Sequence, residues 1–99
     1  MNKKTPQIEM PKLIEMMQYA NIPYELHEYM GGYHLEYPCT NYCVCSVICH
    51  DFSYGHEEGK LEIMGLLTPR EAECDSVVGS LLATDVFARI ANHFHAEMD

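Results

Sequence analysis

The chain has 99 residues, enough for one domain with a single modest hydrophobic core. Hydrophobic residues make up 47% of the sequence and charged residues 21%, a composition typical of globular proteins and unlike disordered or fibrous ones. Fifteen acidic residues against six basic ones give a formal net charge of −9, which argues against direct binding of nucleic acid or of an anionic membrane. The sequence has no apolar run of bilayer-spanning length and no signal-peptide pattern after Lys3 and Lys4, so we expect a cytoplasmic protein without membrane attachment.

The first predicted element is a helix that begins near Pro11, because the missing N–H of proline costs nothing in the first helical turn. Its apolar residues recur at helical spacing and share one stripe: Leu13, Ile14, Met16, Met17 and Ala20. Residues 21–23 predict the end of this helix. The polar residues 1–9 predict a flexible lead-in, so we expect a single domain over residues 10–99, and the sequence leaves Met10 open as an alternative start.

A β-hairpin is predicted next, because apolar and polar side chains alternate over residues 24–30 and again over residues 33–37. The Gly31-Gly32 pair between them predicts a two-residue turn, since both central residues of such a turn need positive φ. The resulting register has three characteristic pairs: Met30 with Tyr33, Leu26 with Tyr37, and His27 with Glu36.

Two further strands are predicted at residues 42–50 and 61–67. The first is apolar on both faces, which is typical of a strand covered on both sides. One face would carry cysteines and a valine: Cys43, Cys45, Val47 and Cys49. The other would carry Val44, Ser46 and Ile48. We expect this strand to lie in the interior of the sheet.

The last third of the chain predicts two helices. Thr68, Pro69 and Glu71 form a capping-box pattern that starts a short helix ending near Asp75. Residues 76–83 are expected to form a connection that returns across the domain. The last helix is expected to begin at Thr84 or Asp85. The whole pattern predicts an α+β domain: an antiparallel four-stranded sheet, formed by the hairpin and two further strands, with the N- and C-terminal helices packed on one face.

The five cysteines predict free thiols in a reducing compartment. Cys43 and Cys49 would lie about 20 Å apart on an extended strand, at roughly 3.3 Å per residue, so one ion cannot gather all the sulfur ligands of this stretch. We therefore expect the cysteines to pack as small apolar side chains, with no metal site and no cofactor. A Cys/His metal-binding protein is a competing hypothesis.

The connection of residues 51–60 is longer than a hairpin needs, and long loops in small domains tend to carry binding residues. We take as candidate partner or ligand contacts seven of its residues: Ser53, Tyr54, Gly55, His56, Glu57, Glu58 and Lys60. Asp51, Ser53 and His56 are the residue types of a hydrolytic triad, but three such residues on one short loop rarely converge. We expect no catalytic residue here, and the protein is predicted not to be an enzyme.

Residues 53–55 (Ser-Tyr-Gly), residues 59–68 and residues 75–90 resemble uncharacterised small proteins encoded by phages and prophages of Firmicutes. This resemblance implies an accessory protein of a mobile element, and by analogy an inhibitor of host defence of the anti-CRISPR type. It implies no active-site residues.

These observations together predict a small acidic binding protein that engages a host or phage protein. Residues 51–99 carry most of the negative charge and motivate this hypothesis. The alternative is an oligomer that binds or sequesters a small nucleotide with Tyr54, His56 and Lys60. A homodimer through an exposed sheet edge is a further expectation.

Overall fold

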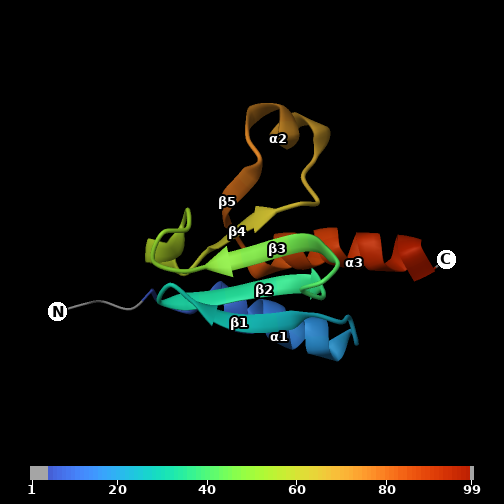
Figure 1. The fold of residues 1–99 in the computed structure, drawn as a ribbon, viewed down its shortest axis with the longest axis horizontal. Coiled ribbons are helices and arrows are strands. Elements are labelled where there is room, and N and C mark those ends of the chain that lie inside the picture. The colour runs from blue at the N-terminus through green and yellow to red at the C-terminus, as the bar shows by residue number, and fades with distance from the viewer. Residues whose placement is uncertain (1–4, 99) are drawn as a thin grey trace.

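The computed structural model describes residues 5–98, which form one antiparallel sheet and three α-helices. The elements in chain order are α1 (Glu9–Tyr19), β1 (Glu25–Tyr29), β2 (Gly32–Pro38), β3 (Cys43–Cys49), the 3-10 turn η1 (His56–Glu58), β4 (Leu61–Met64), α2 (Pro69–Cys74), β5 (Val77–Leu81) and α3 (Ala83–Met98). The strands follow one another across the sheet in the order β1-β2-β3-β4-β5, each antiparallel to the next (Figure 1). The α+β class predicted from the sequence is confirmed.

The sheet has five strands, so the prediction of four was wrong. The added strand, β5, lies in the segment predicted to cross back, and it pairs with β4 through Ile63↔Val78 and Met64↔Val77. Its register shifts between Leu61 and Ile63, and Ser80 has a positive φ of 57°. A bulged strand lacks regular alternation of apolar and polar residues, and this alternation is the signal from which strands are recognised.

The β1–β2 hairpin turns one residue earlier than predicted. Met30 and Gly31 have φ values of 46° and 81°, which makes them the two turn residues, and Tyr29 pairs with Gly32. Gly32 instead belongs to β2, where a Cβ atom would lie 1.9 Å from the carbonyl oxygen of Cys49. The predicted pairs Met30–Tyr33, Leu26–Tyr37 and His27–Glu36 are therefore wrong by two positions. The observed pairs are Leu26↔Leu35, His27↔His34 and Glu28↔Tyr33.

The core is built from alternate residues of the strands together with the apolar sides of α1 and α3. Along β2 and β3, Leu35, Tyr37, Cys45, Val47 and Cys49 are buried, and the residues between them are only partly covered. The buried residues that the helices add are Met10, Leu13, Met17, Ala83, Val86 and Ile90. This confirms that β3 lies in the interior of the sheet, with Cys45, Val47 and Cys49 on its buried face. Cys43, which was predicted on that face, is exposed, and the alternate residues of the other face are only partly buried, so the predicted cover on both sides is wrong.

The helices α1 and α3 pack against each other. The first begins at Glu9, two residues before Pro11, which stands in the first turn where its missing N–H breaks no hydrogen bond. The Glu9 side chain accepts a 2.8 Å hydrogen bond from the backbone N–H of Ala83, so α1 caps the first turn of α3. No helix in the described part of the chain is long and apolar enough to cross a bilayer.

The predicted lead-in, residues 1–9, is described only from Thr5 onward. The hydroxyl of Thr5 donates a 2.6 Å hydrogen bond to Asp51, and the side-chain amide of Gln7 donates to the carbonyl oxygen of Cys49 at 3.3 Å. These bonds hold residues 5–7 against the end of β3.

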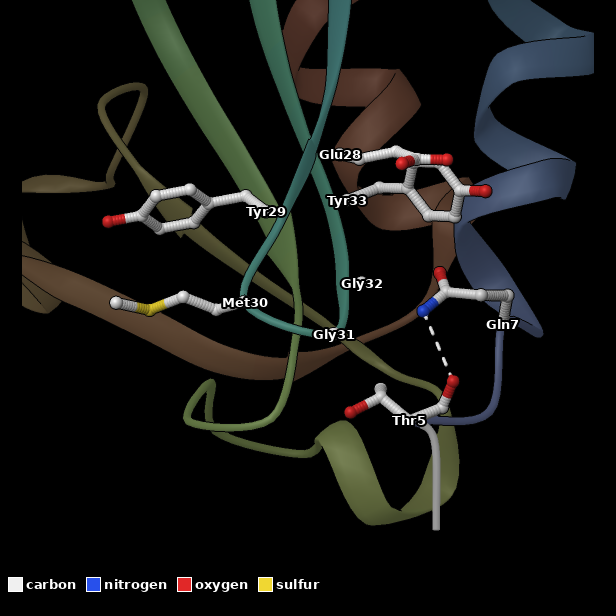
Figure 2. A pocket seen from close by; sticks show the side chains of 8 residues that line it. All are labelled: Thr5, Gln7, Glu28, Tyr29, Met30, Gly31, Gly32 and Tyr33. Carbon is white, nitrogen blue, oxygen red and sulfur yellow. Dashed lines mark hydrogen bonds between the residues drawn. The ribbon is translucent and has the colours of Figure 1, made fainter. Parts of the chain in front are cut away.

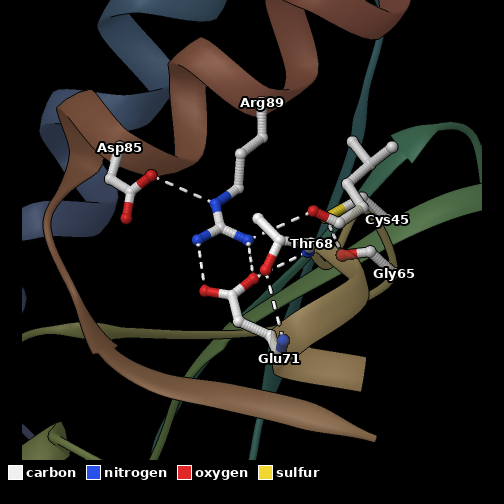
Figure 3. A network of polar contacts seen from close by, with 7 residues as sticks. Cys45, Gly65, Thr68, Glu71, Asp85 and Arg89 are labelled. Carbon is white, nitrogen blue, oxygen red and sulfur yellow. Dashed lines mark hydrogen bonds and ion pairs between the residues drawn. The ribbon is translucent and has the colours of Figure 1, made fainter. Parts of the chain in front are cut away.

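Helix α2 stands away from the sheet on the connection between β4 and β5 (Figure 1). The predicted capping box is confirmed: the Thr68 hydroxyl accepts from the Glu71 N–H, and the Glu71 side chain accepts from the Thr68 N–H. Arg89 of α3 reaches Glu71 with two hydrogen bonds of 2.7 and 2.8 Å, and it also donates to Asp85 and to the carbonyl oxygen of Leu66 (Figure 3). This network fixes α2 to the body of the domain.

Candidate functional site

The 51–60 loop folds back onto two distant parts of the domain. The Tyr54 carbonyl oxygen accepts a hydrogen bond from the Ser80 N–H at 3.1 Å, and the Gly59 carbonyl oxygen accepts one from the Glu9 N–H at 3.0 Å. A Cβ atom at Gly79 would lie 2.3 Å from that of Tyr54, so the loop can lie on β5 only because this residue is glycine. The loop is therefore attached to β5 on one side and to α1 on the other.

Ser53 is a structural residue of this loop. It is 2% exposed, and its hydroxyl accepts a hydrogen bond from the His50 N–H and donates one to the His50 carbonyl oxygen, both at 3.0 Å. The bond between Ser53 and His56 joins their backbones only. Because the hydroxyl is already used within the turn, Ser53 is not placed to act as a nucleophile with His56.

The other predicted contact residues of the loop differ in accessibility. Tyr54 is 65% exposed, while its backbone N–H donates to the buried carboxylate of Glu62 at 2.9 Å. Lys60 lies 3.4 Å from the carboxylate of Glu58. The remaining three are Gly55, in a left-handed conformation, His56, which is half-buried, and Glu57, which is exposed. Only part of the predicted set is thus presented to solvent, and the one lysine in it is paired.

A second polar group, which was not predicted, lies on the sheet beside the turn between β2 and β3. The Nε2 atom of His27 is 3.2 Å from a carboxylate oxygen of Glu36, 3.0 Å from the Thr40 hydroxyl and 3.8 Å from Glu25. The Thr40 hydroxyl also lies within hydrogen-bond distance of both carboxylates. The group comes together because β1 and β2 pair in register, which brings the side chains of residues 25, 27 and 36 to the same face.

Rings of tyrosine, histidine and phenylalanine meet at the other end of the same hairpin. The Tyr29 ring centroid is 6.1 Å from that of His34 and 5.5 Å from that of His50, which in turn lies 6.4 Å from the Phe52 ring. The Nδ1 atom of His50 accepts a hydrogen bond from the Phe52 N–H at 3.1 Å, so a neutral His50 carries its proton on Nε2. These rings form a partly apolar surface next to the 51–60 loop.

The pKa of His34 is lowered from its ordinary value. Burial of the ring is the main cause, the neighbouring charges of His27 and His50 add to it, and Glu36 opposes it. The imidazole of His34 also shares a hydrogen bond with the Ser46 hydroxyl. At neutral pH this part of the sheet therefore presents an uncharged ring among the carboxylates.

The expectation that the cysteines pack as small apolar side chains holds for Cys45 and Cys49 but is wrong for Cys43 and Cys74, which are exposed. The thiols of Cys45 and Cys49 are buried and donate to the carbonyl oxygens of Gly65 and Pro6, each at 3.8 Å. Burial raises the pKa of Cys45 to about 12 and also raises that of Cys49, which keeps both sulfurs protonated. Among residues 5–98, no group of three or more His, Cys, Asp or Glu side chains is arranged to hold a metal ion.

The fold and the surface together define a small α+β protein with a five-stranded antiparallel sheet. Comparison with known proteins gives no match to a family model, to a curated protein or to a solved structure.

Proposed function

We propose that this chain is a non-enzymatic binding protein that engages a basic partner protein through one face of its sheet. In this proposal α1 and α3 both cover the face that carries Leu35 and Val47. The mutual packing of the two helices, the complete burial of these two side chains and the position of both helices behind the strands in Figure 1 support this arrangement.

The opposite face, which we call the open face, consists of the remaining alternate residues of the strands. The pairs His34↔Ile48, Ser46↔Met64 and Met64↔Val77 place these side chains together. The open face comprises Glu25, His27, Tyr29, His34, Glu36, Val44, Ser46, Ile48, Glu62, Met64 and Val77. Met64 is 56% exposed and Tyr29 48% exposed, and Tyr54 of the adjoining loop is 65% exposed. Exposed aromatic residues and methionine are enriched in protein interfaces.

The observation that carries the proposal is that none of the five strands contains a lysine or an arginine. Glu25 gives the open face an exposed carboxylate, Glu36 lies largely covered beside His27, and Glu62 is buried against the Tyr54 N–H. The only basic side chains of this face are the imidazoles of His27 and His34. A surface with apolar side chains beside carboxylates, and without lysine or arginine, is complementary to a lysine- or arginine-bearing protein surface. A second copy of the same acidic face would be repelled.

A charge-insertion experiment tests this proposal. The chain is immobilised and used to capture proteins from a bacterial lysate at low and at high salt. Met64→Arg places a cation on the open face, and Tyr19→Arg, at an α1 position that is 91% exposed, is the matched control with the same new residue. We expect the wild type and Tyr19→Arg to capture the same basic protein at low salt, and Met64→Arg to lose it.

Two results would contradict the proposal: no protein retained at either salt concentration, or equal loss of the captured protein in both arginine variants. A thermal-shift panel of nucleotides provides an independent check, because a nucleotide-binding oligomer would gain stability from its ligand by mass action and a basic-protein binder would not.

The proposal also assigns the protein to a reducing cytoplasm, supported by the buried thiols of Cys45 and Cys49. The resemblance of residues 53–90 to phage- and prophage-encoded proteins of Firmicutes favours a host or phage protein as the partner. Enzymatic activity has no support in the arrangement of Ser53 and His56.

A further inference from the structure

A cavity of about 460 Å³ lies between residues 5–7 and the tip of the β1–β2 hairpin. Figure 2 shows the side chains of Gln7, Glu28 and Tyr33 on the α1 side of the hairpin, and those of Tyr29 and Met30 pointing to the other side. Tyr29 belongs both to the cavity lining and to the open face. Because its side chain points away from those of Gln7 and Glu28, a ligand held by Gln7 and Glu28 would lie on the opposite side of the hairpin from the open face.

Gln7 lines this cavity, and the carbonyl oxygen of its side-chain amide is an acceptor with no partner among the described residues. Its Nε2 atom donates to the carbonyl oxygens of Thr5 and Cys49, both at 3.3 Å, and because only the nitrogen end can donate, these bonds fix the orientation of the amide. The Oε1 atom is buried, and no other described residue offers it a hydrogen bond. A buried carbonyl oxygen without a donor is rare in folded proteins, because burial removes the hydrogen bonds that water would give it.

The one charged side chain among the described residues that line the cavity is a carboxylate, which is also an acceptor. Among residues 5–98 the carboxylate of Glu28 has no ion-pair partner, and the lining contains no lysine, arginine or histidine. Tyr33 adds a phenol whose ring can face a cation. A carboxylate, a fixed amide oxygen and an aromatic ring together suit a positively charged group with several N–H donors.

A neighbouring groove of about 480 Å³ shares Gln7 and Tyr33 with this cavity. Its further lining includes Met10, Ile14 and Leu26, which give it an apolar wall between α1 and β1. An alkyl chain can lie along this wall while its charged end enters the cavity. We propose that the cavity binds an alkyl ammonium group, carried either by a free aliphatic amine or by a lysine side chain.

Nuclear magnetic resonance titration of the ¹⁵N-labelled full chain tests the site. The probes are pentylamine and Nα-acetyl-lysine amide, with pentanol as the uncharged control. We expect both amines to shift the backbone signals of Gly31 and Gly32 and the side-chain amide signal of Gln7, and pentanol to leave them unchanged. Tighter binding of the lysine derivative than of pentylamine assigns the natural ligand to a polypeptide, and the reverse order assigns it to a free amine.

The matched variants are Glu28→Gln and Glu25→Gln, which remove one charge each from the same strand but from opposite faces. Binding of the amines should weaken about five- to tenfold in Glu28→Gln and stay within about twofold in Glu25→Gln. Both carboxylates are exposed, so neither variant threatens the fold, and the spectra themselves report it. The inference is overturned if no signal near the cavity moves with either amine, if pentanol has the same effect, or if both variants weaken binding equally.

Discussion

The guanidinium of Arg89 holds both carboxylate oxygens of Glu71, at 2.7 and 2.8 Å, and this pair joins α3 to the short helix α2. The side chains are 16% and 26% exposed, so the pair is partly shielded from water. Glu71 also completes the capping box with Thr68. One carboxylate therefore both starts α2 and attaches it to the domain.

Replacing Arg89 by methionine should release α2 while leaving the sheet folded. The variant keeps an extended apolar side chain but removes all four hydrogen bonds to Asp85, Glu71 and Leu66. We expect faster amide hydrogen exchange over residues 70–74 with unchanged slow exchange in β3. Arg70→Met, which removes an exposed arginine from α2 itself, is the control, and equal acceleration in both variants would contradict the role given to Arg89.

The stability of the protein should fall in acid partly through Glu71. Hydrogen bonds from Arg89, with help from the Thr68 backbone, lower the pKa of Glu71 from 4.5 to about 2 in the folded chain. Below the unfolded pKa, the unfolded chain binds a proton that the folded chain does not, so this contribution is complete above about pH 4.5 and disappears as the pH falls toward 2.

Urea unfolding of the wild type and of Glu71→Gln across this range of pH measures the effect. The difference in the free energy of unfolding between the two should shrink as the pH falls. Glu73→Gln removes the same charge from the same helix without breaking the pair and serves as the control. A constant difference between wild type and Glu71→Gln at all pH values would exclude this assignment.

The paired residues Leu26 and Leu35 allow a direct test of which side of the hairpin carries the core. Leu35 is fully buried, and Leu26, opposite it on the edge strand β1, is 38% exposed. Leu35→Ala should lower the free energy of unfolding by about 2–5 kcal/mol, whereas Leu26→Ala should cost less than about 1 kcal/mol. Chemical denaturation gives both values, and similar losses would show that β1 is as tightly packed as β2.

The hairpin turn should be improvable at Met30. This residue has a φ of 46°, a left-handed conformation that asparagine adopts more readily than methionine. The second turn position is already occupied by glycine, Gly31, which is the preferred residue there. Met30→Asn should raise the free energy of unfolding by about 0.5–1 kcal/mol. The same substitution at Met64, an exposed residue within a strand, should lower it. A loss of stability in Met30→Asn would mean that the turn is formed differently.

Elements that depend on a short local pattern could be predicted from the sequence. The capping box at Thr68 and the alternating burial of Cys45, Val47 and Cys49 are predictable from short patterns, and both are confirmed. The hairpin register could not be derived because two glycines are adjacent and each has a separate role. Gly31 supplies positive φ, and Gly32 allows the close approach of the Cys49 carbonyl. The second role depends on a residue 17 positions away in the chain, so the local sequence does not indicate it.

The fifth strand and the polar groups escaped prediction for a similar reason. The bulge near Ser80 removes the regular alternation that marks a strand. The group of His27, Glu36 and Thr40 depends on strand pairing, and the free acceptor of Gln7 depends on its bonds to distant carbonyls. The 51–60 loop was recognised from its length, but the burial of Ser53 inside it has no counterpart in the local sequence.

The bond from the Ala83 N–H to Glu9 spans 74 positions of the chain. The Ala83 hydrogen bond is the main cause of the lowered pKa of Glu9, so it favours a charged carboxylate at the first turn of α3. During synthesis α1 leaves the ribosome long before the helix it caps, so this hydrogen bond can form only after the last part of the chain has been made. A shortened polypeptide starting at Met10 would lack the Glu9 carboxylate, so the backbone N–H of Ala83 at the start of its final helix would have no hydrogen-bond acceptor from α1.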